Sequence, residues 1–136
     1  MTILFVDAGN TNVKWRLGQV AELHRCAAET SDFLAWVRAN LSTITSLAVS
    51  SVQSESWNQQ LVVLCDELNL DCWFAQSASE AMGLNSAYAQ PQNLGVDRWL
   101  AMLALWVRSK HGFLLVDSGT ALTLDVVDCQ GKHLGG

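Results

Sequence analysis

The sequence is poor in proline, tyrosine and charge: it has one residue of each of the first two types, and only 15% of its 136 residues are charged. Half of the residues are hydrophobic, which excludes intrinsic disorder as the main description of the chain. Lysine and arginine number 8 against 13 acidic residues, so the basic surface that nucleic acid or an anionic membrane requires is not indicated. We therefore expect the chain to bind neither nucleic acid nor a membrane. Its length is that of one ordinary domain.

The four cysteines form no CxxC pair and no cluster with histidine, so neither a zinc site nor a disulfide framework is indicated. His24, His111 and His133 also lack metal-ligand spacing, and we expect structural or surface roles for them. The first residues, MTILFVDAGN, are apolar but carry no basic leader, and no uncharged apolar run approaches the length of a membrane span. These absences predict a cytoplasmic protein whose thiols stay reduced.

Hydrophobic periodicity predicts an α/β fold with a mixed sheet. Short apolar or alternating runs predict strands at Thr2–Val6, Val13–Leu17, Val20–Ala27, Ser46–Val52 and Asp71–Ala75. Helical spacing predicts one helix capped by Thr30 or Ser31, one over Glu55–Leu68, and one from about Gly95 to Lys110. The first three strands should form an antiparallel meander, and the alternation that follows should extend the sheet in parallel.

Two segments after the fifth predicted strand carry separate expectations. Gln76–Leu94 is polar and contains the only proline, so we expect a long surface loop, which is a common place for function. The helix that follows is apolar around nearly its whole circumference, which predicts burial between two layers or two domains. Trp99 and Trp106 share one face of this helix, where they could pack in the core and also contact a second subunit.

A short pattern occurs twice, as ILFVDAGNTNV at residues 3–13 and as FLLVDSGTALT at residues 113–123. In each copy an apolar strand ends in Val-Asp, a small residue and glycine; Asp7 and Gly9 stand 110 positions before Asp117 and Gly119. A single Asp-x-Gly after a strand is more often a plain hairpin turn than a site. Two copies favour another interpretation, in which paired turns grip the phosphates of a nucleotide from both sides.

The two turns contain the groups that a phosphate site needs. Their glycines let the backbone approach an anion, and the side chains of Asn10, Thr11 and Thr120 add donors. Lys14, on the strand after the first turn, can reach a phosphoryl oxygen as a point charge. The carboxylate of Asp7 alone would repel phosphate, but it becomes useful if it positions Mg²⁺ or a monovalent cation, directly or through water.

The tetrapeptide GVDR begins the third predicted helix. Asp97 falls in its first turn, where the helix dipole and free amides stabilise a carboxylate that could accept a proton. A purely structural aspartate at a helix start would give the same pattern. Arg98 could bind a substrate carboxylate through two parallel hydrogen bonds, although an ordinary ion pair at the helix start fits the sequence equally well.

Three motifs in this order, DAGNTNVK, LGVDRW and VDSGTALTLDVV, resemble the type III pantothenate kinase family, which is grouped by sequence with Bvg accessory factor. The resemblance covers essentially the whole chain. It implies a ribonuclease H-like (actin-like ATPase) α/β domain at 1–110, followed by the first strands of a second, truncated copy at 111–136. The implied activity is transfer of the ATP γ-phosphoryl group to pantothenate, which gives 4'-phosphopantothenate in the first step of coenzyme A biosynthesis.

The resemblance also implies roles for individual residues. Asp97 matches the general base of the family. Asp117 matches a contact to a monovalent cation, K⁺ or NH₄⁺, and Asp7 would hold Mg²⁺. The positions that bind pantothenate are matched by Tyr88, Gly95 and Arg98. The positions that bind the nucleotide phosphates are matched by Asp7, Gly9, Asn10, Thr11, Lys14, Gly119 and Thr120. A homodimer is implied as well, with pantothenate and ATP as small-molecule partners.

Interpretations from two different classes stay open. In one, the chain is a piece or half of an active pantothenate kinase; in the other, it is a catalytically silent fragment or a regulatory binding module like Bvg accessory factor. We expect the family's second domain to continue well past HLGG, which favours the silent interpretation for this polypeptide alone, whereas the intact motifs favour the kinase. A sugar or acetate kinase of the same acetate kinase/sugar kinase/Hsp70/actin superfamily is a third possibility, weakened by the LGVDRW motif, which those kinases lack.

Overall fold

The computed structural model describes residues 2–136, which divide into two compact units. The first unit ends at Ala75, and the second comprises Gln76–Gly136. Each unit has its own hydrophobic core. No helix in the described part of the chain is long and apolar enough to cross a lipid bilayer.

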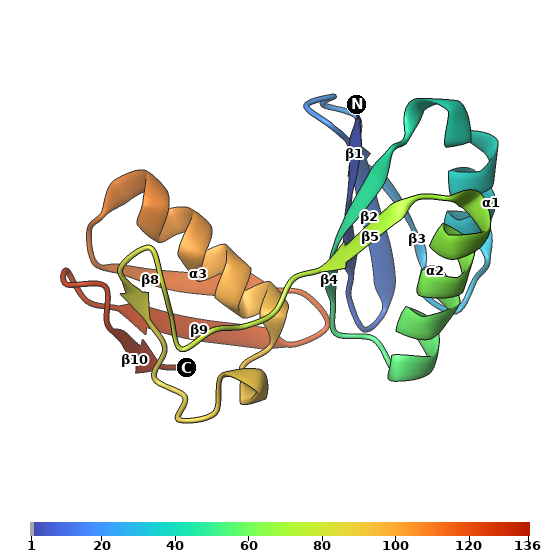
Figure 1. Cartoon of the computed structure of the whole chain (residues 1–136). Helices are drawn as coiled ribbons and strands as arrows, with labels where there is room; N and C mark the ends of the chain where they lie inside the picture. The colour runs from blue at the N-terminus through green and yellow to red at the C-terminus, as the bar shows by residue number, and fades with distance from the viewer. Residues whose placement is uncertain (1) are drawn as a thin grey trace. The chain divides into compact units, whose positions relative to one another are not determined.

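The first unit is built on a five-stranded sheet in the order β3-β2-β1-β4-β5 (Figure 1). Its strands are β1 (Ile3–Ala8), β2 (Asn12–Leu17), β3 (His24–Ala27), β4 (Ser46–Ser51) and β5 (Asp71–Phe74). The first three pair antiparallel, whereas β4 lies parallel to β1 and β5 lies parallel to β4. The predicted mixed sheet, a meander with a parallel extension, is confirmed, and this is the arrangement of a ribonuclease H-like domain.

The strand β3 is shorter than predicted, because it begins at His24 instead of Val20. The amide of Val20 donates to the carbonyl oxygen of Leu17 at 3.1 Å and so closes a turn instead of joining the ladder. The other four strands of this sheet agree with the predicted limits to within two residues at each end.

Two helices, α1 (Asp32–Ala39) and α2 (Glu55–Leu68), cover one face of this sheet (Figure 1). A single 3₁₀ turn, η1 (Leu41–Thr43), leads from α1 towards β4. Alternation along the strands buries every second side chain under the helices, among them Val6 and Trp15, and exposes the side chains between them. The face without helices therefore remains open within this unit.

The two helix starts are capped differently. The hydroxyl of Ser54 accepts the Trp57 amide at 3.2 Å and caps α2, whose limits agree with the prediction. Ser31 occupies the cap position of α1, as predicted, but its side chain makes no capping hydrogen bond within the described residues. The start of α1 is therefore held by packing more than by its cap.

An aromatic cluster fills the space between β2 and α1. The Trp15 ring lies 5.1 Å from Phe33 and 5.6 Å from Trp36 between centroids, and His24 stacks on it at 5.6 Å. Trp15 is only 4% exposed, and its Nε1–H has no hydrogen-bond partner among residues 2–136. Ring packing therefore holds this core, and within the described residues the buried Trp15 N–H stays unpaired.

The second unit packs one helix, α3 (Val96–Ser109), on a three-stranded antiparallel sheet in the order β10-β9-β8 (Figure 1). The strands are β8 (Phe113–Ser118), β9 (Leu122–Val127) and β10 (His133–Gly135). One face of α3 is buried, at Val96, Trp99, Met102 and Trp106, which are spaced by three or four residues. The second copy of the strand–turn–strand pattern predicted from the sequence is therefore present.

Gln76–Leu94, predicted as a surface loop, contains regular structure and core residues. A hairpin forms from β6 (Glu80–Ala81) and β7 (Leu84–Asn85), and a short 3₁₀ turn, η2 (Pro91–Asn93), follows. Leu84 and Leu94 are 0% and 2% exposed, so the description as surface was wrong for both. Isolated leucines in a polar segment give no periodic signal, which is why the sequence did not reveal them.

The prediction that α3 is buried between two layers is not met within the second unit, where one face of the helix is covered. Leu105 and Val107 are 38% and 44% exposed, and the covered face is the one that contains Trp99 and Trp106. The side chains of these two tryptophans are buried in the hydrophobic core of the second unit.

The boundary between the two compact units lies before α3. Since α3 packs on β9, it belongs with the strands that follow it, whereas the predicted first domain, 1–110, included it. The boundary between the units in the chain therefore follows Ala75, and the domain assignment 1–110 and 111–136 stays a prediction.

The side of the β8–β9 hairpin that faces away from α3 is apolar and exposed. Phe113, Leu115 and Val127 point towards the helix, so the alternate residues point outward. We call these residues the outward apolar face: Leu114, Val116, Leu122, Leu124 and Val126, which are 39–66% exposed.

Candidate active site

The first predicted phosphate turn is the loop of the β1–β2 hairpin. The Gly9 amide closes it by donating to the Asn12 carbonyl oxygen at 2.9 Å, and a side chain at Gly9 would lie 3.2 Å from that oxygen. Asp7 and Lys14 are direct partners across the strands, and both are exposed on the face without helices. The structure brings the five predicted residues of this turn together: Asp7, Gly9, Asn10, Thr11 and Lys14.

A residue that sequence analysis missed holds this turn from the neighbouring strand. Gln53 follows β4, and its side-chain amide donates to the carbonyl oxygens of Gly9 and Asn10, the second at 3.2 Å. A glutamine after a strand is ordinary in a sequence. Only the parallel pairing of β4 with β1 brings Gln53 beside the turn.

The second predicted turn is the loop of the β8–β9 hairpin. The Gly119 amide donates to the Ala121 carbonyl oxygen at 3.1 Å, and Asp117 lies opposite Thr123 on the partner strand. Asp117, Gly119 and Thr120 are all exposed. A side chain at Gly119 would meet no described atom within 4 Å, so the space that an anion needs to approach the backbone is open there.

Gly95 and Asp97 shape the first turn of α3. The Asp97 carboxylate folds back over the helix start, where its Oδ1 accepts the backbone N–H of Arg98 at 2.8 Å. A side chain at Gly95 would come within 2.7 Å of that oxygen, which is too close for a real Cβ. Gly95 thus leaves room for the carboxylate, and the peptide N–H groups of the first turn stabilise its negative charge.

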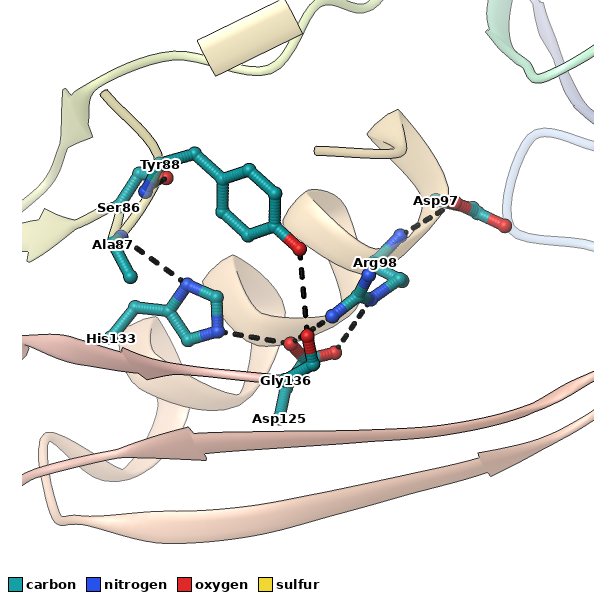
Figure 2. A network of polar contacts seen from close by, with 8 residues as sticks. All are labelled: Ser86, Ala87, Tyr88, Asp97, Arg98, Asp125, His133 and Gly136. Carbon is teal, nitrogen blue, oxygen red and sulfur yellow. Dashed lines mark hydrogen bonds and ion pairs between the residues drawn. The ribbon is translucent and has the colours of Figure 1, made fainter. Parts of the chain in front are cut away.

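The Arg98 side chain is paired with Asp125 of β9 (Figure 2). Nε donates to Oδ2 at 3.0 Å and Nη2 donates to Oδ1 at 2.7 Å, so the ion pair is bidentate. Asp125 is 1% exposed. The hydrogen bonds to Asp125 raise the pKa of Arg98, and they outweigh the opposing effect of burial. Burial alone would raise the pKa of Asp125, but the bonds and charge of Arg98, with His133, lower that pKa below its ordinary value of 3.8.

His133 of β10 extends this network (Figure 2). Its Nδ1 accepts the Ala87 amide at 3.4 Å, so the proton of the neutral ring belongs on Nε2, which lies 2.9 Å from Asp125 Oδ1 and donates to it. Asp125 thereby receives three hydrogen bonds. Tyr88 stacks on His133 with ring centroids 6.1 Å apart, and its hydroxyl donates to the Gly136 carbonyl oxygen at 3.5 Å.

Asp125 was not singled out by sequence analysis, and His133 was given only a structural or surface role. A signal for Asp125 was present, because alternation in LTLDVV places it on the inward face with Thr123 and Val127. A carboxylate at an inward strand position needs a cation or several donors, and Arg98 was a candidate partner. The histidine stands where β9 and β10 pair, and that pairing was not predicted.

The predicted catalytic residue, Asp97, and two predicted substrate-binding residues, Tyr88 and Arg98, lie at or beside the start of α3. The Asp97 carboxylate lies on the other side of Arg98 from Tyr88 and His133 (Figure 2). Asp125 occupies the Nε–Nη2 edge of the guanidinium, which leaves the Nη1 edge as the part that a second carboxylate can use. The arrangement therefore combines a carboxylate with an oriented cation.

Within residues 2–136, no group of three or more His, Cys, Asp or Glu side chains is arranged to hold a metal ion. A cation at Asp7 or Asp117 would therefore take its other ligands from phosphate oxygens, backbone carbonyls and water. Mg²⁺ is commonly bound in this way, through one or two carboxylates together with the phosphates of a substrate. The two turns fit such a cation in the chemistry of their oxygen donors.

The family model and the curated relatives agree on one family. A family model described as type III pantothenate kinase matches residues 3–136. A type III pantothenate kinase of Cellvibrio japonicus is 45% identical over 141 residues, and one of Marinobacter nauticus is 39% identical over 137 residues. Each alignment covers 98% of this chain but only 56% and 57% of the relatives, so the chain spans just over half their length.

Among solved structures, the chain overlaps with the Lmo2764 protein of Listeria monocytogenes, which is named as a proposed N-acetylmannosamine kinase. The sequence identity is 18% and the TM-score is 0.48. The overlap covers 100% of this chain and 50% of that protein.

Proposed function

Because the chain belongs to the type III pantothenate kinase family, we propose that it is part of an ATP-dependent kinase that phosphorylates pantothenate to 4'-phosphopantothenate, the first step of coenzyme A biosynthesis. The observation that carries this proposal is the family match over residues 3–136, which includes both phosphate turns and the start of α3. The geometry around Arg98 adds support, since it presents an oriented cation beside a carboxylate.

The two hairpin turns would bind the phosphates of ATP. The residues proposed for this role are Asp7, Gly9, Asn10, Thr11 and Lys14 in the first turn, and Gly119 and Thr120 in the second. Backbone amides and hydroxyls would contact the phosphate oxygens, and Lys14 would add a positive charge. Phosphoryl transfer depends mainly on positioning and on neutralising charge, which is what these groups supply.

Cations are a second part of the proposal. Asp7 would hold Mg²⁺, directly or through water, and Asp117 would contact a monovalent cation, K⁺ or NH₄⁺. Such cations, when bound, neutralise the charge that the phosphates carry. The exposed positions of both carboxylates at the hairpin ends suit ligands that arrive with the nucleotide.

The start of α3 would bind and activate pantothenate. Asp97 would accept the proton of the substrate hydroxyl as attack on the phosphoryl group begins. Arg98 would bind the pantothenate carboxylate with its Nη1 edge, while Asp125 holds the opposite edge in place. Tyr88 and Gly95 would border the same site. A cytoplasmic homodimer completes the proposal, and size-exclusion chromatography with light scattering would test the oligomeric state.

The test is an assay for ADP release that requires both ATP and pantothenate, with the purified chain. We expect Asp97→Asn to abolish turnover, because an amide cannot accept the proton, and we expect Asp71→Asn, an exposed carboxylate on β5, to leave turnover unchanged. Circular dichroism would verify that each sample is folded. A folded chain without turnover would contradict kinase activity of this polypeptide on its own and favour the binding-module interpretation.

A further inference from the structure

The phosphate turn of the first unit is not held by its own hairpin alone. Inside the hairpin, the closing bond runs from the Gly9 amide to the Asn12 carbonyl oxygen. The carbonyl groups of Gly9 and Asn10 are instead directed to a residue 43 or 44 positions further along the chain, Gln53. The strand pairing explains this, since the Val52 amide continues the β1–β4 ladder by donating to the Ala8 carbonyl oxygen at 3.0 Å.

The orientation of the Gln53 side chain is fixed by its partners. Both Gly9 and Asn10 offer carbonyl oxygens, which can only accept, so the NH₂ group of Gln53 and not its oxygen must face them. One carboxamide therefore holds two successive peptide groups of the turn. Glutamate at this position would place a carboxylate oxygen against the carbonyl oxygens of Gly9 and Asn10, and these oxygens would repel each other.

Two bonds from Gln53 determine where the amides of the turn point. In a trans peptide the C=O and the N–H point in opposite directions. When the carbonyls of Gly9 and Asn10 point at Gln53, the N–H groups of Asn10 and Thr11 are directed to the opposite side. Successive N–H groups directed to one side are the usual geometry of an anion-binding turn.

Gln53 is itself braced from α2. Its backbone amide donates to the hydroxyl oxygen of Ser51 at 3.2 Å, and that hydroxyl donates to the Asn58 side-chain oxygen at 2.6 Å. Asn58 lies in the first two turns of α2, so a chain of contacts runs from this helix through the end of β4 to the turn. The glutamine side chain is therefore held at its base as well as at its end.

We propose that Gln53 is a positioning residue of the phosphate turn, which orients the peptide groups of Gly9 and Asn10 so that the following amides face a bound phosphate. This inference rests on the proposed nucleotide site, because it names what shapes that site. In this role Gln53 would not contact the nucleotide directly. It acts through the backbone of the turn.

The matched control is Gln60, on α2. A cavity of about 420 Å³ in the first unit is bordered by both Gln53 and Gln60, so each can be replaced beside open space without repacking the core. Gln60 is exposed and is remote in the chain from the turn. The variants are Gln53→Met and Gln60→Met, which remove the donor and keep the length of the side chain.

The binding experiment titrates the chain with Mg²⁺ and adenylyl imidodiphosphate, a non-hydrolysable ATP analogue, by calorimetry. We expect Gln53→Met to weaken binding about 3- to 10-fold, the range for losing one or two hydrogen bonds, and Gln60→Met to stay within about 2-fold. In the kinase assay the Gln53→Met loss should fall on the KM for ATP more than on kcat. Equal affinities of wild type and Gln53→Met would overturn the inference.

A second variant, Gln53→Glu, gives a readout that a general loss of stability would not produce. At pH 8 its carboxylate faces two carbonyl oxygens, so binding should be weaker than in Gln53→Met. As the pH falls towards 5, a protonated carboxyl can donate one bond again, so the affinity relative to wild type should recover. A pH profile parallel to that of Gln53→Met would overturn the inference.

Failure of the proposed function can be separated from failure of the inference. If the wild-type chain binds no nucleotide analogue, the proposed function fails for this chain, and amide NMR decides the inference alone. Gln53→Met must then shift the Asn10 and Thr11 amide resonances and speed their hydrogen exchange, whereas Gln60→Met must not. Unchanged turn resonances in Gln53→Met would overturn it.

Discussion

The β1–β2 and β8–β9 hairpins have the same strand lengths and spacing, but the side chains on their inward faces differ. Every strand limit of the second lies 110 positions after the corresponding limit of the first: Ile3–Ala8 and Asn12–Leu17 against Phe113–Ser118 and Leu122–Val127. Both turns are closed by the amide of a glycine. The inward faces differ, however, because the position of Trp15 in the first hairpin is occupied by Asp125 in the second.

Both of these inward side chains are buried, at 4% and 1% exposure, but they stabilise their units in opposite ways. Trp15 packs against other rings, and its Nε1–H has no partner in the described part of the chain. Asp125 receives three hydrogen bonds from Arg98 and His133. Equivalent hairpins thus support a packed aromatic core in the first unit and a charged network in the second. The feature that the two hairpins share is the turn closed by a glycine amide.

The largest expected effect comes from removing the charge in the second hairpin. Asp125→Ala leaves the Arg98 guanidinium and the His133 ring without their acceptor in a buried place. Breaking a buried ion pair from one side costs about 3 kcal/mol or more, so the free energy of unfolding should fall by that amount. Urea unfolding at pH 7, followed by circular dichroism, measures it.

The control for that variant is Asp117→Asn, on the same hairpin but exposed. We expect its change in unfolding free energy to stay within about 0.5 kcal/mol. A loss of less than about 1 kcal/mol for Asp125→Ala would contradict the claim that the charged network organises the second unit.

Acid should reveal the same difference between the units. The pKa of Asp125 is lower in the folded chain than its ordinary value of 3.8, so its stabilising contribution is present above that value and is lost as pH falls below it. We expect the urea concentration at the unfolding midpoint to decrease once the pH is below about 4. The decrease should be steeper in wild type than in Asp125→Asn. Parallel pH profiles for the two proteins would refute this assignment.

A smaller effect is expected from Trp15→Phe in the first hairpin. The variant loses part of the buried ring area, but it also removes a buried N–H that has no partner within residues 2–136. These terms oppose each other, and we expect a net loss of only about 1 kcal/mol in thermal or urea unfolding. A loss as large as that of Asp125→Ala would show that the indole nitrogen is satisfied after all, for example by a buried water.

The smallest effect is expected from making the second hairpin resemble the first on its outward side. Leu124 stands 110 positions after Lys14 and is 48% exposed, so Leu124→Lys should change the melting temperature by no more than about 2 °C. A clear destabilisation would mean that the outward apolar face is covered in solution, and analytical ultracentrifugation would then identify self-association.

Local patterns were enough to predict most of the fold. The apolar runs and the spacing in Glu55–Leu68 were strong signals, and the strand order follows from a meander joined to alternating helices and strands. Leu84 and Leu94 escaped notice because their burial depends on packing with α3, which no short window contains. The shared face of Trp99 and Trp106 was predicted, but not the exposure of the opposite side of α3.

The residues proposed for function also fall into a group that was predicted and a group that was not. The two turns and the start of α3 were predicted, because their residues lie close together in the chain. Gln53 and Asp125 act on residues 43 and 27 positions away, so only the strand pairing and the placement of α3 on β9 bring them to their partners. Residues that orient a site from a distance carry no motif of their own.

The outward apolar face has a practical consequence for handling the chain. Leucine and valine side chains in contact with water bind fluorescent hydrophobic dyes and adhere to alkyl chromatography resins. Sulfate and phosphate salts strengthen such adhesion, so ammonium sulfate should precipitate the chain at unusually low concentration, and low-salt buffers should keep it dispersed.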